Sequence, residues 1–269
     1  MRYPLTFTPL SASMPAIATH PVGDVLLGTS LQRSSPAPAS RPIAVVLDLF
    51  GTLVAAPSAA ERRAAAAQFA AVLRVSPTVA ESVLSDSWQA RHDGHLASTT
   101  EVAAYLVTRC DVSAACVDEL EMLLARIAHL RLQADATLLQ ALEQLQRRGV
   151  RLAVLSDASP DIAEAWSGGD LAPYFDAAVF SCREGAVKPA PQLFRAVLRE
   201  LGAAPHQVLY CGDGGGDELA GAERVGIRAV RVERRGGSTG LAFGETPWSG
   251  SSIPDVEALP SLLDSWGKR

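Results

Sequence analysis

The chain has 269 residues, a formal net charge of -5 and 48% hydrophobic residues, a composition typical of globular proteins rather than of disordered or fibrous chains. This acidic balance, without a basic stripe interleaved with aromatic residues, argues against nucleic acid as a partner. The four cysteines show no paired spacing and no apolar run reaches the length of a membrane span, so we expect a cytoplasmic protein without membrane association.

The first residues lack the apolar pattern of a folded element. Residues 1–41 end in a stretch rich in serine, proline and alanine, and we expect them to form a flexible tail. The ordered fold is expected to begin with residues 43–47, an unbroken apolar run typical of a strand that is covered on both faces. Asp48 follows this strand directly.

The next part of the chain has a helical pattern. Residues 57–132 are rich in alanine, glutamate and arginine, with apolar residues at helical spacing such as Phe69, Val72 and Leu73. Beyond Asp135, helical patterns alternate with short apolar runs. These runs are residues 151–155, 178–180, 208–211 and 228–232. Such alternation predicts a parallel sheet with helices between its strands.

Polar residues follow the predicted strands at the edge where an open parallel sheet binds its ligand. They are Asp48 after the first strand, Ser156 and Asp157 after the second, Lys188 after the third, and Asp213 with Asp217 after the fourth. Carboxylates, a hydroxyl and a cation suit phosphoryl transfer, in which an oxygen nucleophile attacks a phosphate held by cations and hydrogen-bond donors. Asp48 and Asp213 would supply the oxygen ligands that Mg²⁺ prefers.

These four motifs, in this order and at these strand ends, resemble those of the haloacid dehalogenase-like hydrolase superfamily, and the likeness runs from residue 43 to the C-terminus. The resemblance implies that Asp48 is the nucleophile of a phosphatase and carries an aspartyl-phosphate intermediate. It further implies that Ser156, Asp157 and Lys188 bind phosphate. The implied Mg²⁺ ligands are Asp48, the backbone carbonyl of Phe50 and Asp213, with Asp217 supporting the water shell of the ion.

The resemblance also implies an α/β fold with a Rossmann-like parallel sheet, formed by residues 42–56 and 133–269, and an inserted α-helical cap of residues 57–132. Such caps close over the site and contact the substrate, here expected to be a small phosphorylated molecule. The cap residues with the most suitable chemistry are Trp88, Arg91, His92 and His95. The alternative is that Trp88 is a core residue and that the histidines are surface groups.

One residue departs from the phosphatase pattern. Most phosphatases of the superfamily carry a second Asp two residues after the nucleophile, where it protonates the leaving group, but this chain has Phe50 there. Losing a positioned acid removes roughly 10²–10⁴-fold in rate. The dehalogenase branch has an aromatic residue at this position and needs no metal, so a metal-free dehalogenase that uses Asp48 is one alternative, and a non-catalytic protein is another.

The fourth motif favours the phosphatase. Dehalogenases of the superfamily have Ser and Asn in place of the Gly-Asp pair, whereas this chain retains Gly212, Asp213 and Asp217. Acidic residues crowded around Asp48 are expected mainly where a cation lies between them. We therefore expect Mg²⁺ as the cofactor.

Overall fold

A parallel sheet of six strands forms the centre of the computed structural model, which describes residues 41–233 and 247–266. The strand order is β3-β2-β1-β4-β5-β6, and every neighbouring pair is parallel. The strands are β1 (Ala44–Leu47), β2 (Arg151–Ser156), β3 (Ala177–Phe180), β4 (Val208–Gly212), β5 (Arg228–Val232) and β6 (Ser252–Ile253). The predicted α/β fold is confirmed. The predicted tail lies outside the described residues except for Arg41.

Strand β1 lies in the middle of the sheet because all four of its residues are apolar and fully buried. Its neighbours are β2 on one side and β4 on the other, and Leu47 pairs with Val154 and with Cys211. This register brings the carboxyl ends of the three strands to one edge, so the residues that follow them lie together.

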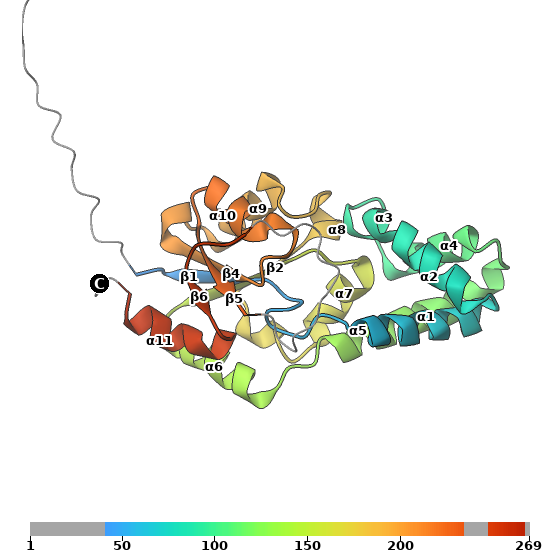
Figure 1. Cartoon of the computed structure of the whole chain (residues 1–269), viewed down its shortest axis with the longest axis horizontal. Helices are drawn as coiled ribbons and strands as arrows, with labels where there is room; N and C mark the ends of the chain where they lie inside the picture. The colour runs from blue at the N-terminus through green and yellow to red at the C-terminus, as the bar shows by residue number, and fades with distance from the viewer. Residues whose placement is uncertain (1–40, 234–246, 267–269) are drawn as a thin grey trace, which may run out of the picture. The chain divides into compact units, whose positions relative to one another are not determined.

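Helices cover both faces of the sheet, as Figure 1 shows for α6 (Ala136–Arg147) and α11 (Leu259–Asp264) on one face, and for α9 (Pro191–Leu201) and α10 (Glu218–Arg224) on the other. Each face has its own cluster of buried apolar residues. Helix α9 ends at Gly202, which has a φ of 55° and closes the helix in the left-handed conformation.

Five further helices lie between β1 and α6, where the helical pattern predicts them. They are α1 (Ala59–Leu73), α2 (Pro77–Asp86), α3 (Trp88–His92), α4 (Thr99–Arg109) and α5 (Val117–Arg131). Serine caps three of them: Ser58 forms a capping box with Glu61, and Ser76 and Ser98 each accept a bond from the third residue of their helix. These five helices, which we call the cap helices, share a buried apolar cluster of their own.

The contacts that join the cap helices to the elements beside the sheet include a pair of hydrogen bonds and a close backbone approach. Glu164 of α7 (Pro160–Ala165) accepts bonds from the backbone N–H and the hydroxyl of Thr99, at 3.1 and 2.6 Å, at the start of α4. The turn at Gly94 meets Gly185, the residue after α8 (Ser181–Glu184), so closely that a Cβ on Gly94 would lie 2.9 Å from the Gly185 Cα. The described residues from Arg41 onward accordingly belong to one compact unit.

None of the helices in the described ranges combines the length and the apolar character that a bilayer crossing demands.

Helix α10 packs against its neighbours through Gly221. A Cβ at this position would lie 2.8 Å from the ring of Phe194 and 2.9 Å from the ring of Pro189. We expect Gly221→Ala to lower the free energy of unfolding by about 1–3 kcal/mol because of this overpacking, as measured by chemical denaturation. Gly168→Ala is the control, because no atom lies within 4 Å of the added Cβ. An unchanged denaturation midpoint for Gly221→Ala would contradict the close packing.

Candidate active site

Asp48 lies at the end of β1 and is buried, with 4% of its surface exposed. Its backbone N–H donates to the carbonyl of Cys211 at 2.9 Å, which extends the β1–β4 ladder by one residue. Its side chain accepts a bond from the Thr52 hydroxyl at 3.2 Å and one from the Lys188 ammonium at 2.5 Å. The chain then turns at Gly51, whose φ is +89° and where a Cβ would lie 2.4 Å from Asp213 Oδ2. Only glycine lets this turn approach Asp213.

Lys188 connects two carboxylates at the centre of the site. Its ammonium lies 2.5 Å from Asp48 Oδ1 and 2.5 Å from Glu218 Oε2. Burial opposes its positive charge, but Asp48 and Glu218 outweigh this effect and hold the pKa of Lys188 well above its usual value. The backbone N–H of Lys188 donates to Asp157 Oδ1 at 2.9 Å, which ties the loop that carries the lysine to the end of β2.

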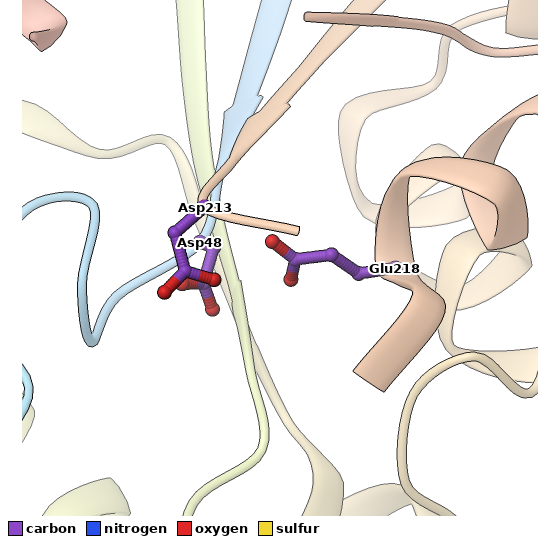
Figure 2. A group of neighbouring side chains, drawn as sticks. All are labelled: Asp48, Asp213 and Glu218. Carbon is purple, nitrogen blue, oxygen red and sulfur yellow. The ribbon is translucent and has the colours of Figure 1, made fainter. Parts of the chain in front are cut away.

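Glu218, the first residue of α10, is a site residue that sequence reasoning missed. It is 1% exposed and points to Asp48 and Asp213, as Figure 2 shows. Its Oε2 accepts bonds from Lys188 and from the Tyr210 hydroxyl at 2.7 Å, and its Oε1 accepts one from the backbone N–H of Gly214 at 3.0 Å. Both oxygens are therefore engaged, and the carboxylate holds Lys188 in place.

Three buried carboxylates, Asp48, Asp213 and Glu218, form the acidic group of the site, with one oxygen of each within 4.8 Å of the others. Burial first, then Glu218 and Asp213, raise the pKa of Asp48 to about 8, although Lys188 acts in the opposite direction. When all three carboxylates are ionised, the ammonium of Lys188 leaves an excess of two negative charges in the site. This donor set fits a divalent cation, and Asp48 and Asp213 are the ligands that the sequence predicts for it.

The other predicted site residues outside the cap helices have the following surroundings. Ser156 ends β2 and is buried, and its hydroxyl lies 3.4 Å from the carbonyl of Asp157. Burial raises the pKa of Asp157 to about 6. The side chain of Phe50 packs, partly buried, against an apolar cluster beneath the sheet. Asp217 precedes α10 with a φ of 55° and is not part of the acidic group.

The cap residues have diverse surroundings. The ring of Trp88 stacks on the ring of His92 with centroids 4.4 Å apart. His92 is buried, so the alternative that it is a surface group is wrong, and burial followed by Arg91 lowers its pKa to about 3. His95 is exposed and lies 2.6 Å from Asp93 Oδ1. Arg91 donates to the carbonyl of Leu84 at 2.7 Å and to the Ser87 hydroxyl at 3.1 Å.

Comparison with known proteins places this geometry in context. Residues 44–226 match a family described as haloacid dehalogenase-like hydrolase. A phosphoserine phosphatase of Thermus thermophilus is 38% identical over 103 residues, which are 38% of this chain and 40% of that protein. A phospholysine phosphohistidine inorganic pyrophosphate phosphatase of Bos taurus is 35% identical over 66 residues, or 23% of this chain and 24% of that protein. The chain thus matches these curated relatives over less than half of their length.

Solved structures of similar fold include both phosphatases and dehalogenases. A structure described as a HAD phosphatase from Thermococcus onnurineus matches with a TM-score of 0.59 and 21% identity, over 82% of this chain and 97% of that chain. A 2-haloacid dehalogenase from Pseudomonas syringae matches with a TM-score of 0.60 and 21% identity, over 84% of this chain and 99% of that chain. At this level of identity the two matches show the shared fold alone.

Proposed function

Because the chain belongs to the haloacid dehalogenase-like hydrolase family, we propose that it is a Mg²⁺-dependent hydrolase that removes a phosphate group from a small molecule through an aspartyl-phosphate on Asp48. The observation that carries this proposal is the acidic group, in which Asp48 and Glu218 are paired with Lys188 and Asp213 lies beside them. Such an excess of buried negative charge is unfavourable unless a cation offsets it.

The residues of the site divide the chemistry between them. Asp48 attacks the phosphorus atom, and the bond from phosphorus to the leaving-group oxygen breaks as the aspartyl-phosphate forms. Lys188 and the Ser156 hydroxyl hold the phosphate oxygens. Mg²⁺ held by Asp48, Asp213 and the carbonyl of Phe50 would neutralise charge on the phosphate oxygens. Water then attacks the phosphorus, which releases inorganic phosphate and restores the Asp48 carboxylate.

The surrounding residues support this centre. Glu218 fixes the position of Lys188, because its carboxylate accepts a bond from the lysine. The same carboxylate accepts a second bond from the Tyr210 hydroxyl, which holds it in place. Asp217 as a support of the metal's water shell stays a prediction, as does the phosphate contact of Asp157. We further propose that residues 57–132 act as a cap that selects the substrate, while residues 42–56 and 133–269 hold the reacting groups.

A test of this function follows from Phe50, because no acid stands there to protonate a leaving group. With Mg²⁺, we expect phenyl phosphate and acetyl phosphate to be hydrolysed at least about 10²-fold faster than ethyl phosphate, and EDTA to abolish both reactions. Phe50→Asp should reduce the rate advantage of phenyl and acetyl phosphate over ethyl phosphate, because the resemblance implies that an Asp at this position donates a proton to the leaving group. Phe50→Leu, the apolar control, should leave the difference unchanged. The measurement is kcat/KM for each compound and variant.

If the wild type had a similar kcat/KM for all three compounds, another residue would have to supply the proton. Undiminished hydrolysis in EDTA would remove the metal from the proposal. A second candidate, a metal-free 2-haloacid dehalogenase, is favoured by Phe50 but not by the acidic group. An assay of chloride release from 2-chloropropionate, with and without EDTA, distinguishes the phosphatase from the dehalogenase. We expect no release of chloride in either condition.

A further inference from the structure

Tyr210 is a fully buried residue of β4, and its hydroxyl lies 3.5 Å from the Lys188 ammonium. Its backbone is held on both sides, because Tyr210 pairs with Val46 of β1 and with Ala229 of β5. Its ring packs edge-on against the ring of Phe194 of α9, with centroids 5.5 Å apart. The strand and the helix therefore give this hydroxyl a fixed position beside the reacting groups, although no step of the proposed reaction uses it.

The Tyr210 hydroxyl connects Glu218 with Lys188. An ammonium has three donors and no acceptor, whereas an ionised carboxylate only accepts, so the single Tyr210 proton goes to the carboxylate. The hydroxyl donates to Glu218 Oε2 at 2.7 Å, and its oxygen faces the ammonium of Lys188 as an acceptor. Burial and then Glu218 raise the pKa of Tyr210 well above its usual value, so the hydroxyl remains a donor.

Tyr210 also completes the set of donors around Glu218. The ammonium of Lys188 and the Tyr210 hydroxyl both donate to Oε2, and the backbone N–H of Gly214 donates to Oε1. Lys188 ends a flexible four-carbon stem, so it cannot fix the carboxylate, whereas Tyr210 and Gly214 belong to the strand and to the loop after it. If the hydroxyl were removed, only the lysine would remain at Oε2 among the donors that the structure describes, and the carboxylate and the ammonium would move together.

Two carboxylates compete for Lys188. Its ammonium lies 2.5 Å from Asp48 Oδ1 and 2.5 Å from Glu218 Oε2. The bond to Asp48 opposes attack, because a cation on a carboxylate oxygen lowers its basicity and thus its strength as a nucleophile. To hold the phosphate oxygens, the ammonium has to exchange its bond to Asp48 for bonds to the phosphate. Glu218 is the partner that it keeps during this exchange, so the place of Glu218 decides where the ammonium lies.

We propose that Tyr210 is a positioning residue, which acts through Glu218 to hold Lys188 where the ammonium can exchange Asp48 for the phosphate. The exchange itself rests on the proposed function. The hold of Tyr210 on Lys188 does not, because the three side chains are in contact without a substrate. Tyr210→Phe is the variant that isolates this role, since it removes the hydroxyl and keeps the ring against Phe194.

The first test needs no substrate, because the sequence contains only two lysines, Lys188 and Lys268. Protein labelled with ¹³C at the Cε of lysine gives two signals in an NMR spectrum, and Lys188→Met identifies them by removing one. In EDTA, Tyr210→Phe should shift the Lys188 signal and leave the Lys268 signal unchanged. In a Glu218→Met background the same substitution should leave the Lys188 signal almost unchanged, because the carboxylate that transmits the effect is absent.

The second test is kcat/KM for phenyl phosphate with Mg²⁺. Tyr210→Phe should lower it by about 10-fold, as expected when a group that orients a reacting residue is lost. In the Glu218→Met background it should lower it by about twofold or less, since the two substitutions interrupt the same connection. Tyr174→Phe, at a partly buried tyrosine that packs on the opposite face of the sheet, is the control and should change neither kcat/KM nor the Lys188 signal.

A Lys188 signal that does not move in Tyr210→Phe would overturn the proposal. So would equal losses of kcat/KM in both backgrounds, because they would report an effect of the hydroxyl that does not pass through Glu218. If Glu218→Met does not fold, Glu218→Gln takes its place, since an uncharged amide holds an ammonium less firmly. A wild type that hydrolyses no phosphate compound would count against the proposed function, and a shift of the Lys188 signal that depends on Glu218 would still support the hold of Tyr210 on the lysine.

Discussion

Asp48→Asn is expected to abolish turnover of every phosphate compound that the wild type hydrolyses, with a loss on the order of 10⁴–10⁶-fold in kcat. The amide cannot attack phosphorus, so no covalent intermediate forms. The fold should survive, because the amide oxygen can take the place of Oδ1, which accepts the bond from Lys188, while the amide nitrogen that replaces Oδ2 can donate to the Thr52 hydroxyl. Removing one of three clustered carboxylates also reduces their mutual repulsion.

The measurements are steady-state kinetics and mass spectrometry of acid-quenched enzyme, which should show the phosphorylated protein in the wild type and not in the variant. Asp170→Asn is the matched control, since Asp170 is exposed. Turnover in Asp48→Asn above the level of contaminating phosphatases would rule out the covalent route. A loss of activity with a lost thermal transition would instead report unfolding.

Lys188→Met is expected to have the second large effect, on both stability and rate. Removing the ammonium leaves Asp48 and Glu218 buried without their cation, and breaking a buried ion pair in this way costs about 3–5 kcal/mol. The rate should fall by about 10²–10³-fold, the range for losing one group that stabilises transition-state charge. Mg²⁺ should raise the melting temperature of the variant more than that of the wild type, because more negative charge is left to offset.

Thermal melts with Mg²⁺ and with EDTA measure both effects. The sequence contains one other lysine, Lys268, so Lys268→Met is the control and should behave as the wild type does. If Lys188→Met were as stable as the wild type in EDTA, the carboxylates around it would have to be neutral without it. If Mg²⁺ raised the melting temperatures of the wild type and of Lys188→Met equally, the ion and Lys188 would not offset the charge of the same carboxylates.

The sheet and its connections could be predicted from the sequence because their signals are local. The run at residues 43–47 is apolar throughout, as a strand covered on both faces must be, and it forms the fully buried β1. The convergence of Asp48, Lys188 and Asp213 could also be predicted, because parallel strands end at one edge. Strand β6 was not predicted, since two residues carry no periodicity and Ser252 falls in a segment rich in glycine and serine.

Glu218 could not be predicted because backbone geometry decides which acid of its loop turns inward. Two acids, Asp217 and Glu218, follow the run of three glycines. Gly214, Gly216 and Asp217 all have positive φ, and these turns direct Glu218 rather than Asp217 toward Lys188. No spacing rule encodes such a sequence of turns. The partner of Glu218 is equally hidden, since Tyr210 reads as an ordinary strand residue until its hydroxyl is seen to donate to the glutamate.

The central position of β1 keeps the strand before Asp48 fixed, so that motion during the reaction cycle is expected in the cap helices. The amide of Asp48 is bonded to Cys211 and its strand is paired on both sides, so its proton should exchange with solvent only when the whole sheet opens. The cap helices pack on α7 and α8 and form no part of the sheet, and Thr99 of α4 bonds to Glu164 of α7 at this junction. Substrate entry and product release would then change deuterium uptake in α1–α5, while the strand that carries the nucleophile keeps the same protection throughout the cycle.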